Sequence, residues 1–299
     1  MADRFASLAP RIGARVEVAR EEVLSPSFAG ECLAALERHG VLLFPEIRFT
    51  DEEQIAFSEN LGDIMFFGGK RPDGSPDPIY KISLDPKVNP IGADYLENTT
   101  GWHIDGTIER DALPPRASIL AALRVSTTGG QTEFCNTYAA YEDLSKADQT
   151  RLESHRVVHS FEASFYARNP NPNPEELGVW RKMEARRERI GHLGAKEQPL
   201  VWQHRSGRKS LVLGVTADHV VGLPARESRA LLGRLNEHAT RPENVYRHDW
   251  KIGDVLMWDN CGVMHRAIPY GKDSGRLMHR TTLCGIEGIE GVAALERVD

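Results

Sequence analysis

The sequence is most informative in one stretch, Val255-Leu256-Met257-Trp258-Asp259-Asn260-Cys261-Gly262-Val263-Met264-His265. Its first four residues form an apolar run, which predicts a buried strand, and turn-forming residues follow at 259–262. His265 therefore follows a turn at the end of an apolar strand. A histidine there can be a metal ligand, or it can be a core residue that bonds a strand carbonyl.

Similar short apolar segments recur through most of the chain. One strand is predicted at 41–44, and turn residues separate seven more, at 79–84, 118–125, 156–161, 200–204, 210–215, 254–258 and 280–284. Ser206-Gly207 is typical of a hairpin tip between two of them. Many short strands with few helices indicate a mostly β protein with a closed or two-sheet architecture, and we expect a single domain over 1–299.

Three helices are predicted beside these strands. The first begins after Ser25 or Ser27 and ends at Gly40, which can adopt the left-handed conformation. Thr50-Asp51-Glu52-Glu53 is a capping box that opens a second helix, which ends at Gly62. The third covers 225–240, with three leucines on its buried side.

The composition excludes several classes of protein. A net charge of −6 and a pI near 6.0 argue against a general nucleic-acid binder, because such a protein needs a basic face. We expect neither a signal peptide nor a bilayer-crossing stretch. The four cysteines are scattered, without a C-x-x-C pair, and read as reduced core residues: Cys32, Cys135, Cys261 and Cys284. We therefore expect a cytoplasmic protein.

Residues 166–196 differ in composition from the rest of the chain. They contain alternating Pro and Asn and then dense charge, a composition that builds little core. Two interpretations stay open at this stage. The segment is a surface excursion, or it is a lid over an active site, since long loops on rigid scaffolds often cover such sites.

A candidate metal site begins with His103-Ile104-Asp105. On an extended strand, residues two apart point to the same side, so both side chains can reach one ion. His265 would complete the two-histidine, one-carboxylate set of non-haem iron(II) oxygenases, which leaves positions open for substrate and oxygen. Taken alone, the pair is a weak signal, because a chain with 11 His and 43 acidic residues produces such pairs by chance.

Two arginines strengthen this interpretation. Arg276 and Arg280 enter an apolar strand region, and a spacing of four residues places both on one face of a strand. Buried arginine is costly unless it is paired, so the two residues invite anionic partners in one cavity. The alternative is ordinary ion pairing at the surface.

The chain resembles the taurine dioxygenase and 2,4-dichlorophenoxyacetate dioxygenase family, nearer the aryloxyacetate branch. The resemblance runs from about Gly13 to Thr282. It is carried by GWHIDGT (101–107), STTGGQTEFCNTYAAYEDL (126–144), SGRKSLVLG (206–214), HVVGLP (219–224), LNEHAT (235–240), VYRHDWKIGDVLMWDN (245–260), HRAIPY (265–270) and GRLMHRTTL (275–283).

The resemblance implies a double-stranded β-helix, or cupin-like jelly roll, with Fe(II) bound by His103, Asp105 and His265. It implies 2-oxoglutarate and O2 as co-substrates. By position, Arg276 matches the arginine that grips the distal carboxylate of 2-oxoglutarate, and Thr132 matches the hydroxyl that assists it. Arg280 matches the arginine for the anionic end of the substrate. Related halogenases lack the carboxylate of Asp105, so its presence implies hydroxylation.

Two lysines receive roles from the same resemblance. Lys70 falls where the aryloxyacetate enzyme has a lysine close to the co-substrate, and Lys87 falls near a lysine proposed to help bind the substrate carboxylate. The alternative for both is a solvated surface charge. Relatives of this kind are often homo-oligomers, although no segment here identifies an interface.

The chain also departs from the family pattern. Gly106-Thr107-Ile108 follows the His-x-Asp motif where relatives carry small polar residues and then Phe, so the pocket wall beyond the metal is reshaped. Residues 166–196 look longer and more charged than in the aryloxyacetate enzyme. Both departures bear on the substrate, and neither touches the metal ligands.

Three hypotheses follow. The first is a dioxygenase that hydroxylates a small carboxylate, such as an aryloxyalkanoate, with ether cleavage and release of succinate and CO2. The second keeps this chemistry for a sulfonate or alkyl sulfate, which a guanidinium binds equally well. The third is a cupin-like binding protein that retains a metal without catalysis. The presence of Thr132 and Arg276 argues against the third, because a pure binder needs no co-substrate clamp.

Overall fold

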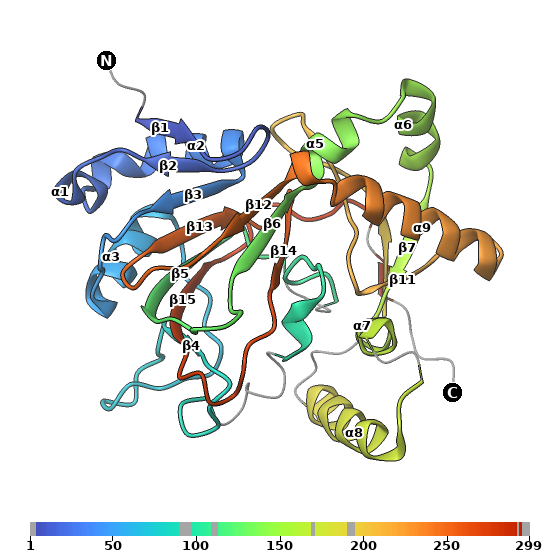
Figure 1. The fold of residues 1–299 in the computed structure, drawn as a ribbon. Coiled ribbons are helices and arrows are strands. Elements are labelled where there is room, and N and C mark those ends of the chain that lie inside the picture. Colours follow the sequence, from blue (N-terminus) through green and yellow to red (C-terminus); the bar gives the residue numbers. More distant parts are fainter. Residues whose placement is uncertain are drawn as a thin grey trace.

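The apolar run that ends at the turn before His265 forms the centre of the largest sheet. We analysed a computed structural model, which describes residues 4–89, 97–108, 113–168, 171–189, 195–291 and 293–294. The largest sheet has seven strands in the order β1 (Phe5–Ser7), β2 (Ala14–Val16), β3 (Val41–Phe44), β13 (Val255–Asp259), β5 (Ala117–Arg124), β15 (Leu277–Leu283) and β4 (Tyr80–Ile82) (Figure 1). Every residue of β13 is buried, as expected for a strand with neighbours on both sides.

Two helices cover one face of this sheet. α2 (Ala29–His39) and α3 (Asp51–Leu61) bury apolar side chains against Phe44 and Met257 of the sheet. α3 begins with the predicted capping box, in which Thr50 and Glu53 bond each other's backbone N–H groups. Gly40 ends α2 with a φ of 72°. Ser25 caps the short 3-10 helix η1 (Pro26–Phe28) before α2, so the predicted start of α2 was too early.

A second sheet packs on the other face. It contains β12 (Val245–His248), β6 (Thr132–Asn136) and β14 (Val263–Ala267), in that order. Phe134 from this sheet and Trp258 from the large sheet share one buried cluster. The predicted mostly β, two-sheet architecture is confirmed, although the described strands form separate sheets and do not close into a barrel.

Many of the remaining elements surround a further core, which includes Leu152, Val157, Leu211 and Leu232. The additional strands are β7 (Arg156–His159), β8 (Lys196–Pro199), β9 (Val201–Gln203), β10 (Lys209–Leu211), β11 (Ala217–Val220) and β16 (Ala293–Ala294). The additional helices are α1 (Arg20–Val23), η2 (Glu97–Thr100), α5 (Thr137–Glu142), α6 (Lys146–Glu153), α7 (Phe161–Arg168), α8 (Pro174–Arg189), α9 (Ala225–Ala239) and η3 (Pro242–Asn244). α1 packs with the large sheet through Val23, and α7 and α8 form a small separate cluster with Ile108.

The eight predicted strands all occur; β3 has the predicted bounds 41–44, and the ends of the other seven are shifted. Phe161 belongs to α7 and not to the predicted strand 156–161, and the strand predicted at 280–284 begins earlier, at Leu277. The hairpin tip at Ser206-Gly207 joins β9 and β10, and Gly207 has a φ of 87°. The third predicted helix corresponds to α9.

Residues 166–196 build little core, as their composition predicted. Most of the described part of this segment is helical (Figure 1). Trp180 of α8 is its one buried apolar side chain among the described residues and shares a small cluster with Phe161 and Phe165 of α7 and with Ile108. Part of the segment, residues 169–170 and 190–194, lies outside the described residues.

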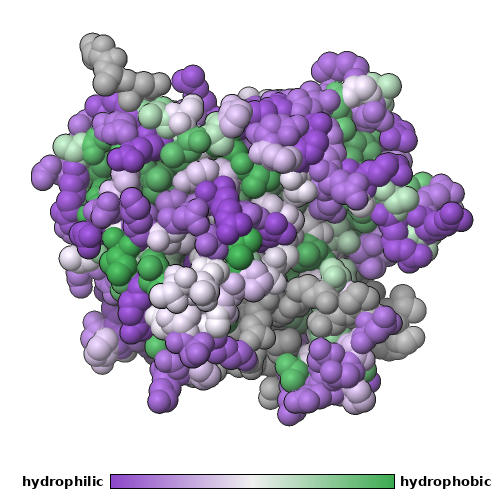
Figure 2. Space-filling view, in the orientation of Figure 1, coloured by the Kyte–Doolittle hydropathy of each residue, from purple (hydrophilic) through white to green (hydrophobic). Residues whose placement is uncertain are grey.

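The surface and the cysteines agree with the reading of the composition. Hydrophilic residues cover most of the face in Figure 2, and hydrophobic residues form small separate groups. Each helix in the described part of the chain is too short or too polar to cross a bilayer. Cys32, Cys135 and Cys261 are buried, Cys284 is half-buried, and all four are free thiols.

Candidate metal centre

Backbone pairing brings two histidines together from distant parts of the chain. The N–H of His103 donates to the carbonyl of His265 at 3.0 Å, and the N–H of His265 donates to the carbonyl of His103 at 2.9 Å. Residues that exchange both bonds lie directly opposite each other, with their side chains on one face. The structure therefore places the two imidazoles side by side, with ring centres 4.2 Å apart.

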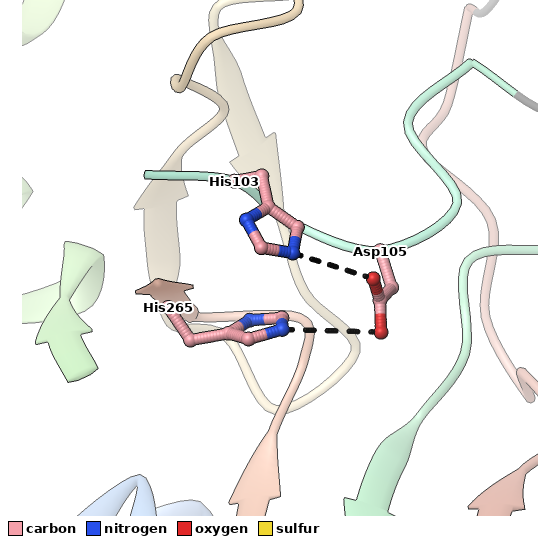
Figure 3. A group of neighbouring side chains, drawn as sticks. All are labelled: His103, Asp105 and His265. Atoms are coloured by element: carbon pink, nitrogen blue, oxygen red, sulfur yellow. Dashed lines mark ion pairs between the residues drawn. The ribbon is translucent and has the colours of Figure 1, made fainter. Parts of the chain in front are cut away.

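Asp105 adds a carboxylate to this pair (Figure 3). Its Oδ1 lies 3.7 Å from Nε2 of His103, and its Oδ2 lies 4.0 Å from Nε2 of His265. The three potential ligand atoms lie within 4.8 Å of one another. The predicted extended strand is only an isolated bridge at His103, and Asp105 already belongs to a turn.

The protonation of these groups suits a metal. Nδ1 of His103 lies 2.8 Å from the carbonyl of Gly101, which fixes the proton on Nδ1 and leaves the Nε2 lone pair toward the centre. Burial, assisted by His103 and Arg280, lowers the pKa of His265 to about 3, so its imidazole is neutral at neutral pH. Burial raises the pKa of Asp105, but Arg280, His265 and His103 together bring it below its usual value.

Two neutral imidazoles and one carboxylate are the donors that fit a non-haem Fe(II) ion. Each donor comes from a backbone that other contacts hold in place, so the group does not have to assemble from mobile loops. The residues present therefore fit the metal that the sequence predicted.

Arg280 lies against the carboxylate of this cluster. Its Nη1 donates to Oδ2 of Asp105 at 3.2 Å, and its guanidinium lies beside the rings of Phe67 and Tyr80, 5.1 and 5.3 Å from their centres, which are 5.5 Å from each other. The Nε atom is buried and has no hydrogen-bond partner among the described residues. The sequence analysis missed the two aromatic residues, because only the tertiary fold brings them to Arg280.

Arg276 has different contacts from Arg280. It directly precedes β15, and the register shift at Leu277 and Met278 skips Leu123 of β5, so β15 itself stays regular. That both guanidinium groups enter one cavity stays a prediction. Arg276 is 4% exposed, donates to the hydroxyl of Tyr270 at 3.3 Å and lines a cavity of about 200 Å³.

Trp250 connects that cavity to Thr132. The indole lines the cavity with Arg276, and its Nε1–H donates to the Thr132 hydroxyl at 3.0 Å. Thr132 lies on β6 two residues from Phe134, which pairs with His265, and two strand residues span about 7 Å. Gly130 permits this packing, since a Cβ there, at a φ of 80°, would lie 3.1 Å from Cδ of Arg276.

The two lysines lie apart from these groups. Lys70 is exposed in a small turn that is closed by a bridge to Pro76, and Lys87 is exposed beside Asp85. Within the described part of the chain, neither side chain has a recorded contact with the cluster. Their binding roles remain predictions.

The turn beyond the metal cluster is buried. Thr107 and Ile108 are 2% and 7% exposed, and Ile108 shares a buried cluster with Trp180 of α8. The departure from the family pattern at 106–108 and the departure at 166–196 therefore each contribute a side chain to one apolar cluster.

Comparisons with known proteins identify relatives over nearly the whole chain. The family model described as "Taurine catabolism dioxygenase TauD, TfdA family" matches residues 4–282. The chain is 36% identical over 289 residues to the alpha-ketoglutarate-dependent 2,4-dichlorophenoxyacetate dioxygenase of Cupriavidus pinatubonensis, covering 92% of this chain and 95% of that protein. It is 32% identical over 270 residues to an alkylsulfatase of Acinetobacter baylyi, covering 88% and 80% of the two chains.

Solved structures agree with these matches. The crystal structure of AAD-2 in complex with Mn(II) and N-oxalylglycine superposes with a TM-score of 0.76 at 30% identity, covering 97% of this chain and all of that one. A taurine dioxygenase from Burkholderia xenovorans gives a TM-score of 0.74 at 32% identity, covering 98% and 95%. These similarities confirm the jelly-roll fold that the sequence predicted.

Proposed function

The chain belongs to the TauD, TfdA family and is an Fe(II)- and 2-oxoglutarate-dependent dioxygenase, and we propose that it hydroxylates an aryloxyalkanoate or a similar ether carboxylate. We propose His103, Asp105 and His265 as the metal ligands. The convergence of these three side chains, with Arg280 beside them, is the observation that carries the proposal. When bound, the iron and the co-substrates supply the oxidising power, converting 2-oxoglutarate to succinate and CO2.

We assign the substrate anion to Arg280. Its Nη1 already bonds Asp105, while the buried Nε–H has no partner among the described residues. An anion at that Nε–H would lie close to the metal ligands, and the carbon next to the anion would face the reacting position. Hydroxylation of a carbon that carries an ether oxygen gives a hemiacetal, which collapses and breaks the ether bond.

The neighbours of Arg280 favour an aromatic substrate. Phe66 and Phe67 are 52% and 40% exposed, and Phe67 and Tyr80 flank the guanidinium. An aryl group can stack on such rings, and stacked pairs contribute about 0.5–1.5 kcal/mol beyond the area they bury. A small aliphatic sulfonate would leave these rings uncovered.

We assign the distal carboxylate of 2-oxoglutarate to Arg276 and Thr132. The buried guanidinium has no carboxylate partner among the described residues, and arginine binds carboxylates through two parallel N–H groups. Because Trp250 donates to the Thr132 oxygen, the hydroxyl hydrogen of Thr132 is available for the co-substrate.

The second candidate keeps the reaction and changes the anion to a sulfonate or an alkyl sulfate. The similarity to an alkylsulfatase and to a taurine dioxygenase supports it, and a guanidinium binds all three anions. We propose that Lys87 adds positive charge near the substrate anion and that Lys70 does so near the co-substrate. Both side chains are exposed, so these roles require the segments that carry them to bring the lysines to the site.

A substrate panel tests both candidates. The purified protein would receive Fe(II), ascorbate and 2-oxoglutarate under air, with aryloxyacetates, aryloxypropionates, alkyl sulfates and taurine offered separately. We expect the fastest succinate release with an aryloxyalkanoate and none from the His265→Ala protein. Faster turnover of a sulfate or sulfonate would replace the first candidate with the second. Oxygen consumption without any dependence on the panel would argue against both.

Other features stay proposals as well. We propose one domain over 1–299 that works in the cytoplasm without nucleic acid or a membrane, and light scattering would test for a homo-oligomer. The acidic net charge supports the absence of nucleic acid. We also propose that residues 166–196 form a lid, which is supported by the buried cluster that Trp180 shares with Ile108, three residues after Asp105.

A further inference from the structure

One buried side chain joins the segments that carry the second and third proposed metal ligands. Asn260 lies in the turn between β13 and β14 and is fully buried. Its Oδ1 accepts the backbone N–H of Asp105 at 2.9 Å, and its Nδ2 donates to the backbone carbonyl of Asp105 at 3.0 Å. Nδ2 also donates to the carbonyl of Pro115 at 3.1 Å.

Both backbone groups of one residue are thus held by one amide. Asp105 lies in a turn, where no neighbouring strand fixes its peptide groups. The carboxamide of Asn260 supplies one acceptor and one donor in a plane, as a neighbouring strand would. The direction in which the Asp105 side chain leaves the backbone therefore depends on Asn260.

The turn that carries Asn260 is itself firmly held. Asp259 accepts a hydrogen bond from the Tyr138 hydroxyl at 3.0 Å and one from the backbone N–H of Cys261 at 3.0 Å. Gly262 lets the Tyr138 ring lie against the turn, because a Cβ there would come within 1.7 Å of that ring. These contacts hold Asn260 in a fixed position, in the turn that leads into β14, five residues before His265.

We propose that Asn260 is a positioning residue, which sets the carboxylate of Asp105 at the correct distance from the two imidazoles and thereby controls metal affinity. The His103–His265 backbone pair fixes the imidazoles, and Asn260 fixes the carboxylate against them. The inference rests on the proposed metal ligands and adds a residue that touches neither the metal nor a substrate.

Binding of Mn(II) alone, measured by electron paramagnetic resonance of the free ion, tests the inference without turnover. We expect Asn260→Ala to weaken Mn(II) binding by about 10- to 100-fold, the usual range for groups that orient a metal ligand. Asn260→Asp keeps an acceptor for the N–H of Asp105 but turns a carboxylate oxygen toward two carbonyls, so we expect an intermediate loss. Unfolding of the metal-free proteins is measured in parallel.

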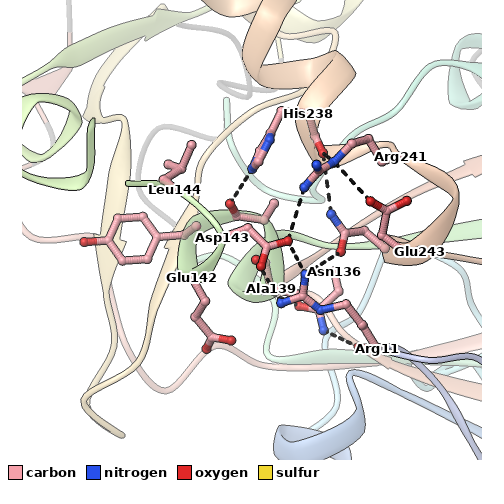
Figure 4. Close-up of polar contacts among 12 residues, drawn as sticks. Arg11, Asn136, Ala139, Glu142, Asp143, Leu144, His238, Arg241 and Glu243 are labelled. Carbon is pink, nitrogen blue, oxygen red and sulfur yellow. Dashed lines mark hydrogen bonds and ion pairs between the residues drawn. The ribbon is translucent and has the colours of Figure 1, made fainter. Parts of the chain in front are cut away.

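Asn136 provides a matched control (Figure 4). It is 5% exposed, its Oδ1 accepts the N–H of Ala139 at 3.0 Å, and its Nδ2 donates to the carbonyl of Arg11 at 2.7 Å. Asn136→Ala thus removes a similar amide clamp on the backbone, at a place that holds no proposed metal ligand. Since Asn136 reaches the Asn260 turn only through α5 and Tyr138, we expect Asn136→Ala to lower the unfolding temperature and to weaken Mn(II) binding much less than Asn260→Ala does.

The outcomes separate the inference from the proposed function. Unchanged Mn(II) affinity in Asn260→Ala, with lower stability only, would reduce Asn260 to a structural residue. An equal loss of affinity in Asn136→Ala would show that general loosening explains the effect. Tight Mn(II) binding by Asp105→Ala would instead remove Asp105 from the ligand set, and the proposed function would fail with it. If Asn260→Ala does not fold, the same criteria apply to Asn260→Asp.

Discussion

Two polar corners of the molecule each contain an aspartate beside cationic or ionisable side chains. At one corner the charged groups pair with one another, and at the other some polar atoms stay unpaired within the part of the chain that the structure describes. At the corner around α5, Asp143 pairs with both Arg11 and Arg241, and Arg241 also lies 3.4 Å from Glu243 (Figure 4). At the metal centre, Asp105 faces two imidazoles and Arg280. The first corner neutralises itself, whereas the second leaves His265 Nδ1 and Arg280 Nε without partners among the described residues.

The difference shows which observations separate a structural cluster from a functional one. The pKa values of both aspartates are lowered, Asp143 chiefly through its hydrogen bond to Arg11 and Asp105 through Arg280 and the histidines against burial. The direction of the pKa shift therefore does not distinguish them. What distinguishes Asp105 is that its neighbours His103 and His265 direct ligand atoms to one point and that nearby buried nitrogen atoms of His265 and Arg280 have no partner among the described residues.

Matched substitutions of the two aspartates should give the largest contrast. Asp105→Asn removes the anionic donor, so we expect Mn(II) binding and succinate formation to be abolished. Asp143→Asn removes a partly exposed ion pair, so we expect the free energy of unfolding to fall by only about 0.5–1 kcal/mol. Calorimetry and a succinate assay on both proteins make the measurement. Full activity in Asp105→Asn would show that Asp105, like Asp143, has only a structural role.

Matched arginines extend the comparison. Arg276→Ala deprives the proposed 2-oxoglutarate site of a buried guanidinium, and we expect the KM for 2-oxoglutarate to rise on the order of 100-fold. Arg241→Ala removes a half-exposed partner of Asp143 and should leave that KM unchanged. Steady-state kinetics at saturating prime substrate provide the values. If Arg280→Ala raised the 2-oxoglutarate KM as much as Arg276→Ala, the division between the two arginines would be wrong.

The sequence predicted those helices and strands whose local sequence pattern matches the burial and contacts that they have in the folded protein. The apolar run 255–258 became the buried strand β13, and the capping box at Thr50 opened α3. β6 and β14 were missed, because Thr132–Asn136 and Val263–Ala267 mix polar and apolar residues and gain their burial from pairing with each other. The helix α8 was not predicted, because its residues are mostly charged and Trp180 is its one buried apolar side chain among those described.

The same limit applies to the site. The motif spacing and the resemblance identified the three candidate ligands, and the structure brings them together. The cluster of Phe67, Tyr80 and Arg280 joins residues from three separate segments, and no local sequence pattern predicts it. Strand periodicity placed Arg276 and Arg280 on one face, and the register shift beside Leu277 falls on β5 and leaves β15 regular, so their shared cavity stays a prediction.

His159 is a buried histidine outside both corners, and it makes the stability of the protein depend on pH. Burial lowers the pKa of His159 from 6.5 to about 4, and its Nδ1 lies 2.9 Å from the Thr216 hydroxyl. As pH falls below 6.5, the unfolded chain takes up a proton that the folded protein refuses, so stability declines until about pH 4. Between neutral pH and pH 5 we expect His159 to account for a loss of about 2 kcal/mol.

The measurement compares the free energy of unfolding of the wild-type and His159→Asn proteins across that pH range. Asn can keep a bond to Thr216 but does not titrate, so its stability should fall less steeply with acid. Both proteins are measured without metal, because acid also acts on His103 and His265 when a metal is bound. Parallel curves for the two proteins would show that His159 does not titrate between folded and unfolded states.

Substitution of Trp250 should give the smallest change in kinetics. It tests whether the hydrogen bond from the indole to Thr132 contributes to binding of 2-oxoglutarate. Trp250→Phe keeps a ring against His248 but removes the N–H that donates to Thr132. A neutral hydrogen bond contributes about 0.5–1.5 kcal/mol, so we expect the KM for 2-oxoglutarate to rise about 3- to 10-fold with kcat nearly constant. Thr132→Ala is the reference: if it raises the KM and Trp250→Phe does not, Thr132 acts without help from the indole. If neither changes the KM, Thr132 does not contact the co-substrate, and Arg276 alone holds its distal carboxylate.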